Sequence, residues 1–217
     1  MRHTLVETNW VFGFAAPSHH KNPDAVELLA RARRGELRLH LSSICLTEVV
    51  HPLRMQCQPR EEADAIRTFL NGMRDSSRVN AQDYQMVVRL LSQFESAIKL
   101  ELAVVPQILA SLRTEPAIEI FPMNEAMLAK AVDLALVELP LRPFDQSVLA
   151  SVLVRARELW DSGETDLCFC ETDKDLQPLR KPNDILQNLY EKARVWVYED
   201  FKLTKPVRAP GWPLQHT

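Results

Sequence analysis

Residues 3–9 read HTLVETN, in which a short apolar run is followed by Glu7, Thr8 and Asn9. The run predicts a strand over residues 3–7. Four further short apolar segments have the same character and predict strands over residues 37–41, 117–121, 167–171 and 195–198. Segments with helical periodicity separate these strands. Because alternating strands and helices are typical of parallel βαβ crossovers, we expect an α/β fold whose sheet is covered on both faces.

Helix boundaries follow from apolar periodicity and from residues that favour helix ends. Helices are expected over residues 24–34, from residue 44 to about residue 52, over 60–102 with Asn80 as an internal cap, from the cap Asn124 onward, and over 143–160 and 183–193. The helix after Asn124 is expected to bury Leu128, Ala131 and Ala135. Prolines beyond residue 202 predict an irregular tail over residues 201–217.

These elements predict one domain over residues 1–200, with a helical insertion at about residues 59–116. The insertion carries two apolar stripes, which must be buried against other apolar surface. Either the rest of the domain or a second copy of the chain would provide it, so a homodimer is one expected assembly.

Composition excludes several classes of protein. The chain has 217 residues, 46% of them hydrophobic, and a formal net charge of −3. This apolar fraction excludes a disordered chain, while no apolar run is long enough to span a membrane. Its five glycines stand apart, which excludes Rossmann and P-loop nucleotide sites, so no nucleotide cofactor is expected. A nucleic acid would be held by local patches or metal ions, because the overall charge is not basic.

The N-terminus and the cysteines indicate the compartment. Glu7 interrupts the first segment before the apolar core of a signal peptide could form, so we expect a cytoplasmic protein with reduced thiols. The four cysteines do not have the spacing of a zinc site and are expected to be small buried residues: Cys45, Cys57, Cys168 and Cys170.

Four acidic residues, far apart along the chain, lie just beyond predicted strands or in the first turns of the helices that follow. They are Glu7, Glu48, Asp145 and Asp173. Sheets of this kind bind ligands outside the carboxyl ends of their strands. Carboxylates that meet there repel one another, and a divalent cation such as Mg²⁺ or Mn²⁺ removes the conflict. An acidic cluster without a positioned His or Cys therefore favours metal-assisted hydrolysis of a phosphodiester.

Each acid also has a purely structural explanation. Asp145 would interact with a helix dipole, Asp173 would cap a helix or form an Asx turn, Glu48 would be solvated, and Glu7 would pair with an arginine. Their shared position at one edge of the sheet favours a joint metal site over four separate explanations.

Three segments around these acids resemble the PIN domain family of metal-dependent ribonucleases. LVETN at residues 5–9 resembles the opening motif, and LSSICLTEV at residues 41–49 resembles the second. The third segment runs from PFD at residues 143–145 through CETDKDL at residues 170–176 and resembles the family's third acid, the helix that carries it and the closing turn. The resemblance covers roughly residues 1–55 and 117–200. It implies a three-layer α/β/α fold with about five parallel strands.

The resemblance also implies the site and its partners. The catalytic acids would be Glu7, Glu48, Asp145 and Asp173, of which Glu7, Asp145 and Asp173 would bind Mg²⁺ or Mn²⁺. Supporting polar groups would be Asn9, Thr172 and Asp175. The substrate would be RNA, and because the family includes the toxins of toxin–antitoxin pairs, an antitoxin protein is a further expected partner.

Other residues offer contacts to RNA. A basic run contains Arg31, Arg34 and Arg38, which would bind the RNA backbone or form a solvated helix face. Trp10 would stack on a base or pack against the sheet.

Three hypotheses about function follow. The first is a Mg²⁺- or Mn²⁺-dependent ribonuclease. The second is a catalytically weakened PIN-like scaffold that binds RNA or a protein, because the family usually has Asp where this chain has Glu7. The third, a haloacid dehalogenase-like phosphatase, needs Asp-x-Asp after the first strand, whereas this chain has Glu7, Thr8 and Asn9 there.

Overall fold

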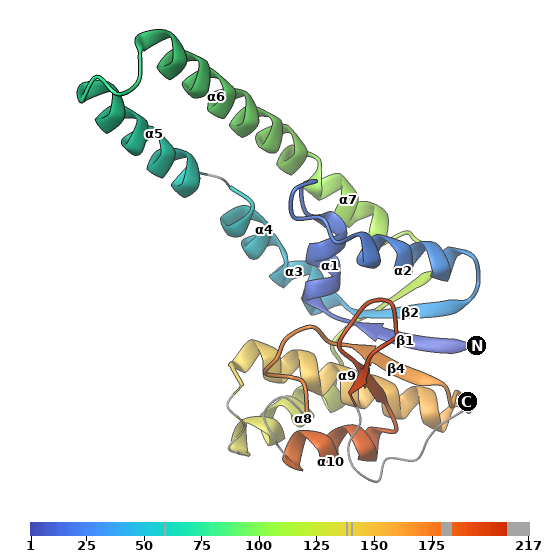
Figure 1. The fold of residues 1–217 in the computed structure, drawn as a ribbon. Helices are drawn as coiled ribbons and strands as arrows, with labels where there is room; N and C mark the ends of the chain where they lie inside the picture. The colour runs from blue at the N-terminus through green and yellow to red at the C-terminus, as the bar shows by residue number, and fades with distance from the viewer. Residues whose placement is uncertain (59, 138, 140, 179–183, 208–217) are drawn as a thin grey trace.

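The computed structural model describes residues 1–58, 60–137, 139, 141–178 and 184–207. Its strands form one sheet in the order β3-β2-β1-β4-β5-β6 (Figure 1). Within the described residues these strands are β1 (Arg2–Val6), β2 (Leu37–Ser42), β3 (Ile118–Phe121), β4 (Leu167–Cys170), β5 (Trp196–Tyr198) and β6 (Pro206–Val207). The first five are parallel, and β6 is antiparallel to β5. The predicted α/β class is confirmed, with a mostly parallel sheet of six strands.

The helices occupy most of the remaining described chain. They are α1 (Thr8–Ala15), α2 (Pro23–Arg33), α3 (Ser43–Glu48), α4 (Val50–Gln56), α5 (Arg60–Asp75), α6 (Ala81–Ala103), α7 (Val105–Leu112), α8 (Glu125–Leu136), α9 (Pro143–Asp161) and α10 (Asp184–Ala193). Two predicted caps are confirmed. Asn80 Oδ1 accepts a hydrogen bond from the Asp83 backbone N–H at 2.8 Å, and Asn124 Oδ1 accepts one from that of Met127 at 2.9 Å.

The strand order determines where a ligand would bind. The chain runs outward from β1 to β2 and β3, and then returns to place β4 on the other side of β1. Helices α1 and α2 lie on one face of the sheet, while α9 and α10 lie on the other (Figure 1). The crossover direction therefore reverses between β1 and β4, and the crevice beyond their carboxyl ends is the expected ligand site of such a sheet.

Helices α5 and α6 form a hairpin that extends away from the sheet, within the predicted insertion (Figure 1). An ion pair joins the two helices, with Arg67 Nη2 lying 2.6 Å from Glu95 Oε2. Near the tip, the Tyr84 hydroxyl donates a hydrogen bond to Asn71 Oδ1 at 2.7 Å. Helix α7 then leads back to β3, so the insertion returns to the edge of the sheet.

Several expectations are corrected. The expected irregular tail contains β6 at Pro206–Val207, where backbone pairing with β5 is compatible with an edge proline; residues 208–217 lie outside the described part of the chain. Glu7 does not end β1 but caps α1, and Glu171 lies just beyond β4. Leu128 is 56% exposed rather than inward, whereas Met127 and Leu134 are buried on α8.

The burial expected for the cysteines is confirmed, since all four are buried free thiols. No helix in the described part of the chain has the length and apolar character needed to cross a bilayer.

Candidate metal centre

A cavity of about 300 Å³ lies beyond the carboxyl ends of β1 and β4. All four predicted acids line it, together with other residues that include Thr8, Asn9 and Arg142: Glu7, Glu48, Asp145 and Asp173. These acids come from the N-cap of α1, the end of α3, the first turn of α9 and the loop after β4. The topology thus brings residues from distant parts of the chain to one cavity.

Glu7 is the most enclosed of these four acids, with only 5% of its surface exposed. Its Oε2 accepts a hydrogen bond from the Asn9 backbone N–H at 2.8 Å, which fixes the carboxylate at the start of α1. Its Oε1 is buried and has no hydrogen-bond partner among the described residues. Burial and, to a smaller extent, the nearby carboxylates of Glu48 and Asp173 raise the pKa of Glu7 to about 8. A cation beside Oε1 would offset this unfavourable burial.

Glu48 is held by Thr8, a residue whose role the sequence does not reveal. The Thr8 hydroxyl donates a hydrogen bond to Glu48 Oε2. Burial raises the pKa of Glu48, and the carboxylate of Asp145 adds to that shift. Thr8 therefore orients one acid of the cavity while its neighbour Glu7 supplies another.

Arg142 is a second residue of the site that was not among the residues predicted from the sequence. Its Nε donates a hydrogen bond to Asp145 Oδ2 at 2.9 Å, and its side chain is 78% exposed where it lines the cavity. The signal that could have found it is its spacing, because a cation three residues before an acid at a helix start lies within reach of that acid. The cavity thus carries one exposed guanidinium beside its acids.

Glu171 is a further acid at this end of the sheet. It is fully buried, and its Oε1 accepts a hydrogen bond from the Asp173 backbone N–H at 2.5 Å. Its Oε2 has no hydrogen-bond partner in the described structure. Burial, followed by the charge of Glu7, holds the pKa of Glu171 well above its usual range. An acid at the end of the apolar run LCFC was the sequence signal for this residue.

We expect Glu171→Gln to stabilise the metal-free protein by roughly 1–3 kcal/mol near pH 7, because it replaces a buried acid that carries a desolvation penalty with a neutral amide. The folded-state pKa of Glu171 is raised, so the acid destabilises the fold above its unfolded value of 4.5. Gln stays neutral and keeps a carbonyl oxygen for the Asp173 N–H. The gain should vanish below that unfolded value, where the acid is protonated in both states. Urea unfolding at about pH 7 and pH 4 measures the difference, and an equal effect at both would contradict this account.

The predicted supporting residues divide into two groups. Asn9 lines the cavity, whereas Thr172 and Asp175 are exposed and are not among the lining residues. Asp175 still contributes through its backbone, because its N–H donates a hydrogen bond to Asp173 Oδ1 at 2.9 Å. The turn after β4 therefore orients the Asp173 carboxylate with main-chain atoms.

The structure does not bring the basic run to the cavity. Arg38 pairs with His3 in the sheet register, near the amino ends of the strands, while the cavity lies beyond the carboxyl ends. The guanidinium groups of the run lie beside acids: Arg31 and Arg34 at 3.0 and 2.7 Å from Glu36, and Arg38 at 3.9 Å from Glu119. Any RNA contact by these arginines would thus be separate from the candidate metal centre.

Trp10 packs in the core and is not available to stack on a base. Its ring is fully buried, and its Nε1 donates a hydrogen bond to the Ala25 carbonyl at 3.1 Å. Of the two roles expected for Trp10, the structure supports packing and excludes base stacking.

The donor set fits a hard divalent cation. Among the described side chains, no group of three or more His, Cys, Asp and Glu residues is close enough to hold a metal ion as placed. Mg²⁺ usually keeps several waters and binds through few protein carboxylates, so it does not require a closed cage. The shared cavity and the unpartnered Oε1 of Glu7 are compatible with such an open site.

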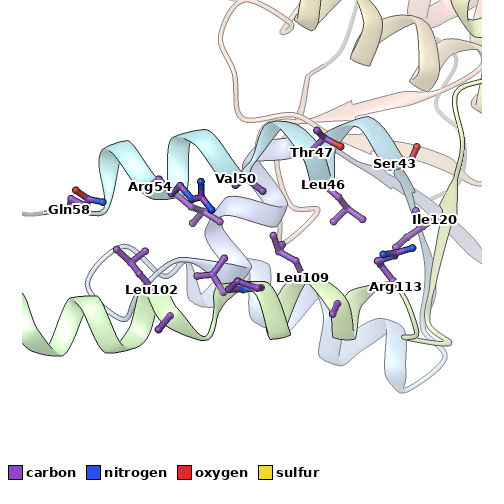
Figure 2. Close-up of a pocket in the computed structure, with 15 residues that line it drawn as sticks. Ser43, Leu46, Thr47, Val50, Arg54, Gln58, Leu102, Leu109, Arg113 and Ile120 are labelled. Carbon is purple, nitrogen blue, oxygen red and sulfur yellow. The ribbon is translucent and has the colours of Figure 1, made fainter.

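A larger cavity of about 840 Å³ lies between α3–α4 on one side and α7 on the other (Figure 2). Its lining is mainly apolar and includes Leu46, Val50, Leu109 and Ile120, with Arg54 and Arg113 as its charged residues. No acid of the described chain lines it, so it lacks the ligands for a divalent cation.

In comparisons with known proteins, the chain matches no family model, no curated protein and no solved structure.

Proposed function

We propose that this chain is a metal-dependent ribonuclease of the PIN type, with the family's three-layer α/β/α arrangement. Glu7, Asp145 and Asp173 would bind Mg²⁺ or Mn²⁺, and Glu48 would complete the acidic site. One observation carries the proposal: four carboxylates from separate segments line one cavity beside the reversal point between β1 and β4.

The protein's own groups would position the reaction. A bound cation would polarise the phosphodiester and lower the pKa of a water molecule. The Thr8 hydroxyl orients Glu48, while the Asn9 and Asp175 N–H groups orient Glu7 and Asp173. Arg142 is exposed beside Asp145, and its planar guanidinium is suited to hold a phosphate oxygen of the substrate.

The state of Glu7 favours a second candidate, a weakened scaffold that binds RNA or a protein. With its pKa raised by burial to about 8, Glu7 is largely protonated at neutral pH in the absence of metal. A protonated acid is a poor ligand until a cation displaces the proton. The side chain is also one methylene longer than the Asp that the resembling motif usually has.

An RNA cleavage assay tests the proposal. We expect the purified chain to cleave a labelled single-stranded RNA when Mg²⁺ or Mn²⁺ is added, to stop in EDTA, and to recover when the metal is restored. Glu7→Asp should retain or increase the rate, because the shorter acid restores the usual motif. An inert wild type with an active Glu7→Asp variant would support the scaffold. If both proteins are inert and neither binds Mn²⁺ by calorimetry, the metal site is wrong.

A further inference from the structure

We infer that two copies of this chain associate through one face of the α5–α6 hairpin, so that the two hairpins form a four-helix bundle. The inference does not depend on the nuclease proposal. It starts from the contacts that hold the hairpin together. Arg67 and Glu95 form an ion pair between the helices, and the Arg74 guanidinium lies 4.7 Å from the centre of the Tyr84 ring. Ala63 is buried and Leu91 half-buried, so one side of each helix faces the other.

Five large apolar side chains lie outside this internal contact. They are Ile66 (43% exposed), Phe69 (67%), Met86 (56%), Leu90 (57%) and Phe94 (46%). The two on α5 are three residues apart and the three on α6 are four apart, which places each set in one stripe along its helix. Two apolar stripes are therefore left exposed on a hairpin that extends from the domain (Figure 1).

Helix geometry places both stripes on the same side of the hairpin. Each exposed residue directly precedes a half-buried one: Arg67, Leu70, Val87, Leu91 or Glu95. At 3.6 residues per turn, each stripe is rotated by about 100° from the inward side of its own helix, in the same sense. Two antiparallel helices are related by a twofold axis perpendicular to the plane that contains them. This rotation moves each helix onto the other but keeps the upper surface of the hairpin on top and the lower surface below. An equal offset therefore turns both stripes to one surface, which we call the hairpin face.

The area of the hairpin face agrees with what a stable dimer needs. At roughly 180 Å² per large apolar side chain, the exposed fractions leave about 500 Å² of apolar surface. Interfaces are about 60% apolar, so this surface corresponds to roughly 800 Å² per partner, the size typical of specific protein interfaces. This surface is as large as the largest apolar patch on a typical monomer, and such patches are often functional.

Charge and symmetry identify the occupant as a second copy. Residues 60–103 contain six basic and seven acidic side chains, so each hairpin has a net charge of only −1 and two of them repel each other weakly. Twofold pairing brings the same face onto itself and buries both stripes in each copy at once. Four antiparallel helices around an apolar core form a stable bundle, whereas a two-helix hairpin buries little apolar surface alone.

At its base, the hairpin face meets the loop between α1 and α2. The Phe94 ring lies 5.9 Å from the His19 ring in an edge-on arrangement, and the Ser18 backbone N–H donates a hydrogen bond to Glu101 Oε2 at 2.5 Å. These contacts anchor the base of α6 to the domain. The hairpin would thus enter the dimer already oriented, which lowers the entropic cost of association.

Sedimentation equilibrium tests the inference. We expect the wild type to have the mass of two chains at about 50 µM, and Leu90→Glu and Phe69→Glu to have the mass of one, with a dissociation constant raised at least 100-fold. Both positions are exposed in the single chain, so the circular dichroism and thermal midpoint of the monomeric variants should report a folded protein. The control Leu136→Glu, at an 82% exposed residue of α8, should remain a dimer.

Two results would overturn the inference. A wild type that stays monomeric at this concentration would show that a second copy does not cover the hairpin face. Leu90→Glu and Phe69→Glu proteins that remain dimeric would place the interface elsewhere on the chain. Asp173→Asn is expected to leave the dimer intact whether or not the chain cleaves RNA, so the two proposals succeed or fail separately.

Discussion

Asp173→Asn is expected to lower metal-dependent RNA cleavage by at least about 100-fold, the effect typical of losing a group that stabilises charge at the reacting centre. Asn has the size of Asp and retains an oxygen to accept the hydrogen bond from the Asp175 N–H. The substitution therefore keeps the turn after β4 and removes only the negative charge. That charge is what holds a divalent cation in the cavity.

The matched control is Asp133→Asn, the same exchange at an exposed residue of α8. It should leave the cleavage rate within about twofold of the wild type, since surface substitutions have small effects. Mn²⁺ titration by calorimetry should show weaker binding for Asp173→Asn alone, with unchanged thermal midpoints for both variants. Equal cleavage by Asp173→Asn and wild type would remove Asp173 from the site and contradict the proposed function.

Trp10→Ala is expected to destabilise the protein by roughly 3–5 kcal/mol, the range for deleting a large buried aromatic side chain. Trp10 is fully buried, stacks on Phe14 with ring centres 5.7 Å apart, and hydrogen-bonds the Ala25 carbonyl. The substitution would leave a cavity between α1 and α2 and an unpaired carbonyl. Because α1 also carries Thr8 and Asn9, loosening it should reduce metal binding as well.

The same substitution at Trp160 provides the comparison. Trp160 is half-buried near the end of α9, where the Arg194 guanidinium lies 5.5 Å from its ring centre. We expect Trp160→Ala to cost less than about 2 kcal/mol, since a half-exposed ring leaves little cavity. Urea unfolding at pH 7 measures both losses. Equal losses of unfolding free energy for the two variants would contradict the view that the buried Trp10 contributes more to stability than the half-buried Trp160.

Much of the fold could be predicted because its signals are local. The helix starts at Asn80 and Asn124 depend on one capping side chain and the three residues after it. They can therefore be recognised in the sequence. Helix α1 could not be found in this way, because TNWVFGFA has no polar face and packs among other elements on most sides. Helix α8 carries apolar residues on more than one face. Its apolar periodicity alone therefore does not show whether Leu128 or Met127 faces the core.

The acids of the candidate site could be predicted because the alternation of strands and helices already predicts a parallel sheet. Acids that follow parallel strands must meet at one edge, and the cavity lined by Glu7, Glu48, Asp145 and Asp173 agrees with that argument. Glu171 was missed because its role depends on burial beside Glu7, which the linear sequence does not reveal. Thr8 was missed because its hydrogen bond joins residues 40 positions apart, whereas Arg142 did have a sequence signal in its i,i+3 spacing from Asp145.

The pairing of β1 with β4 also constrains the order in which the protein becomes functional during its synthesis. β1 begins at Arg2, but its partner on this side begins at Leu167, and Asp173 follows later still. When Glu7 and Glu48 emerge from the ribosome, Asp145 and Asp173, which line the same cavity, have not yet been synthesised. If the chain cuts RNA as proposed, this timing would spare the messenger and ribosome that are producing it at least until synthesis has passed Asp173.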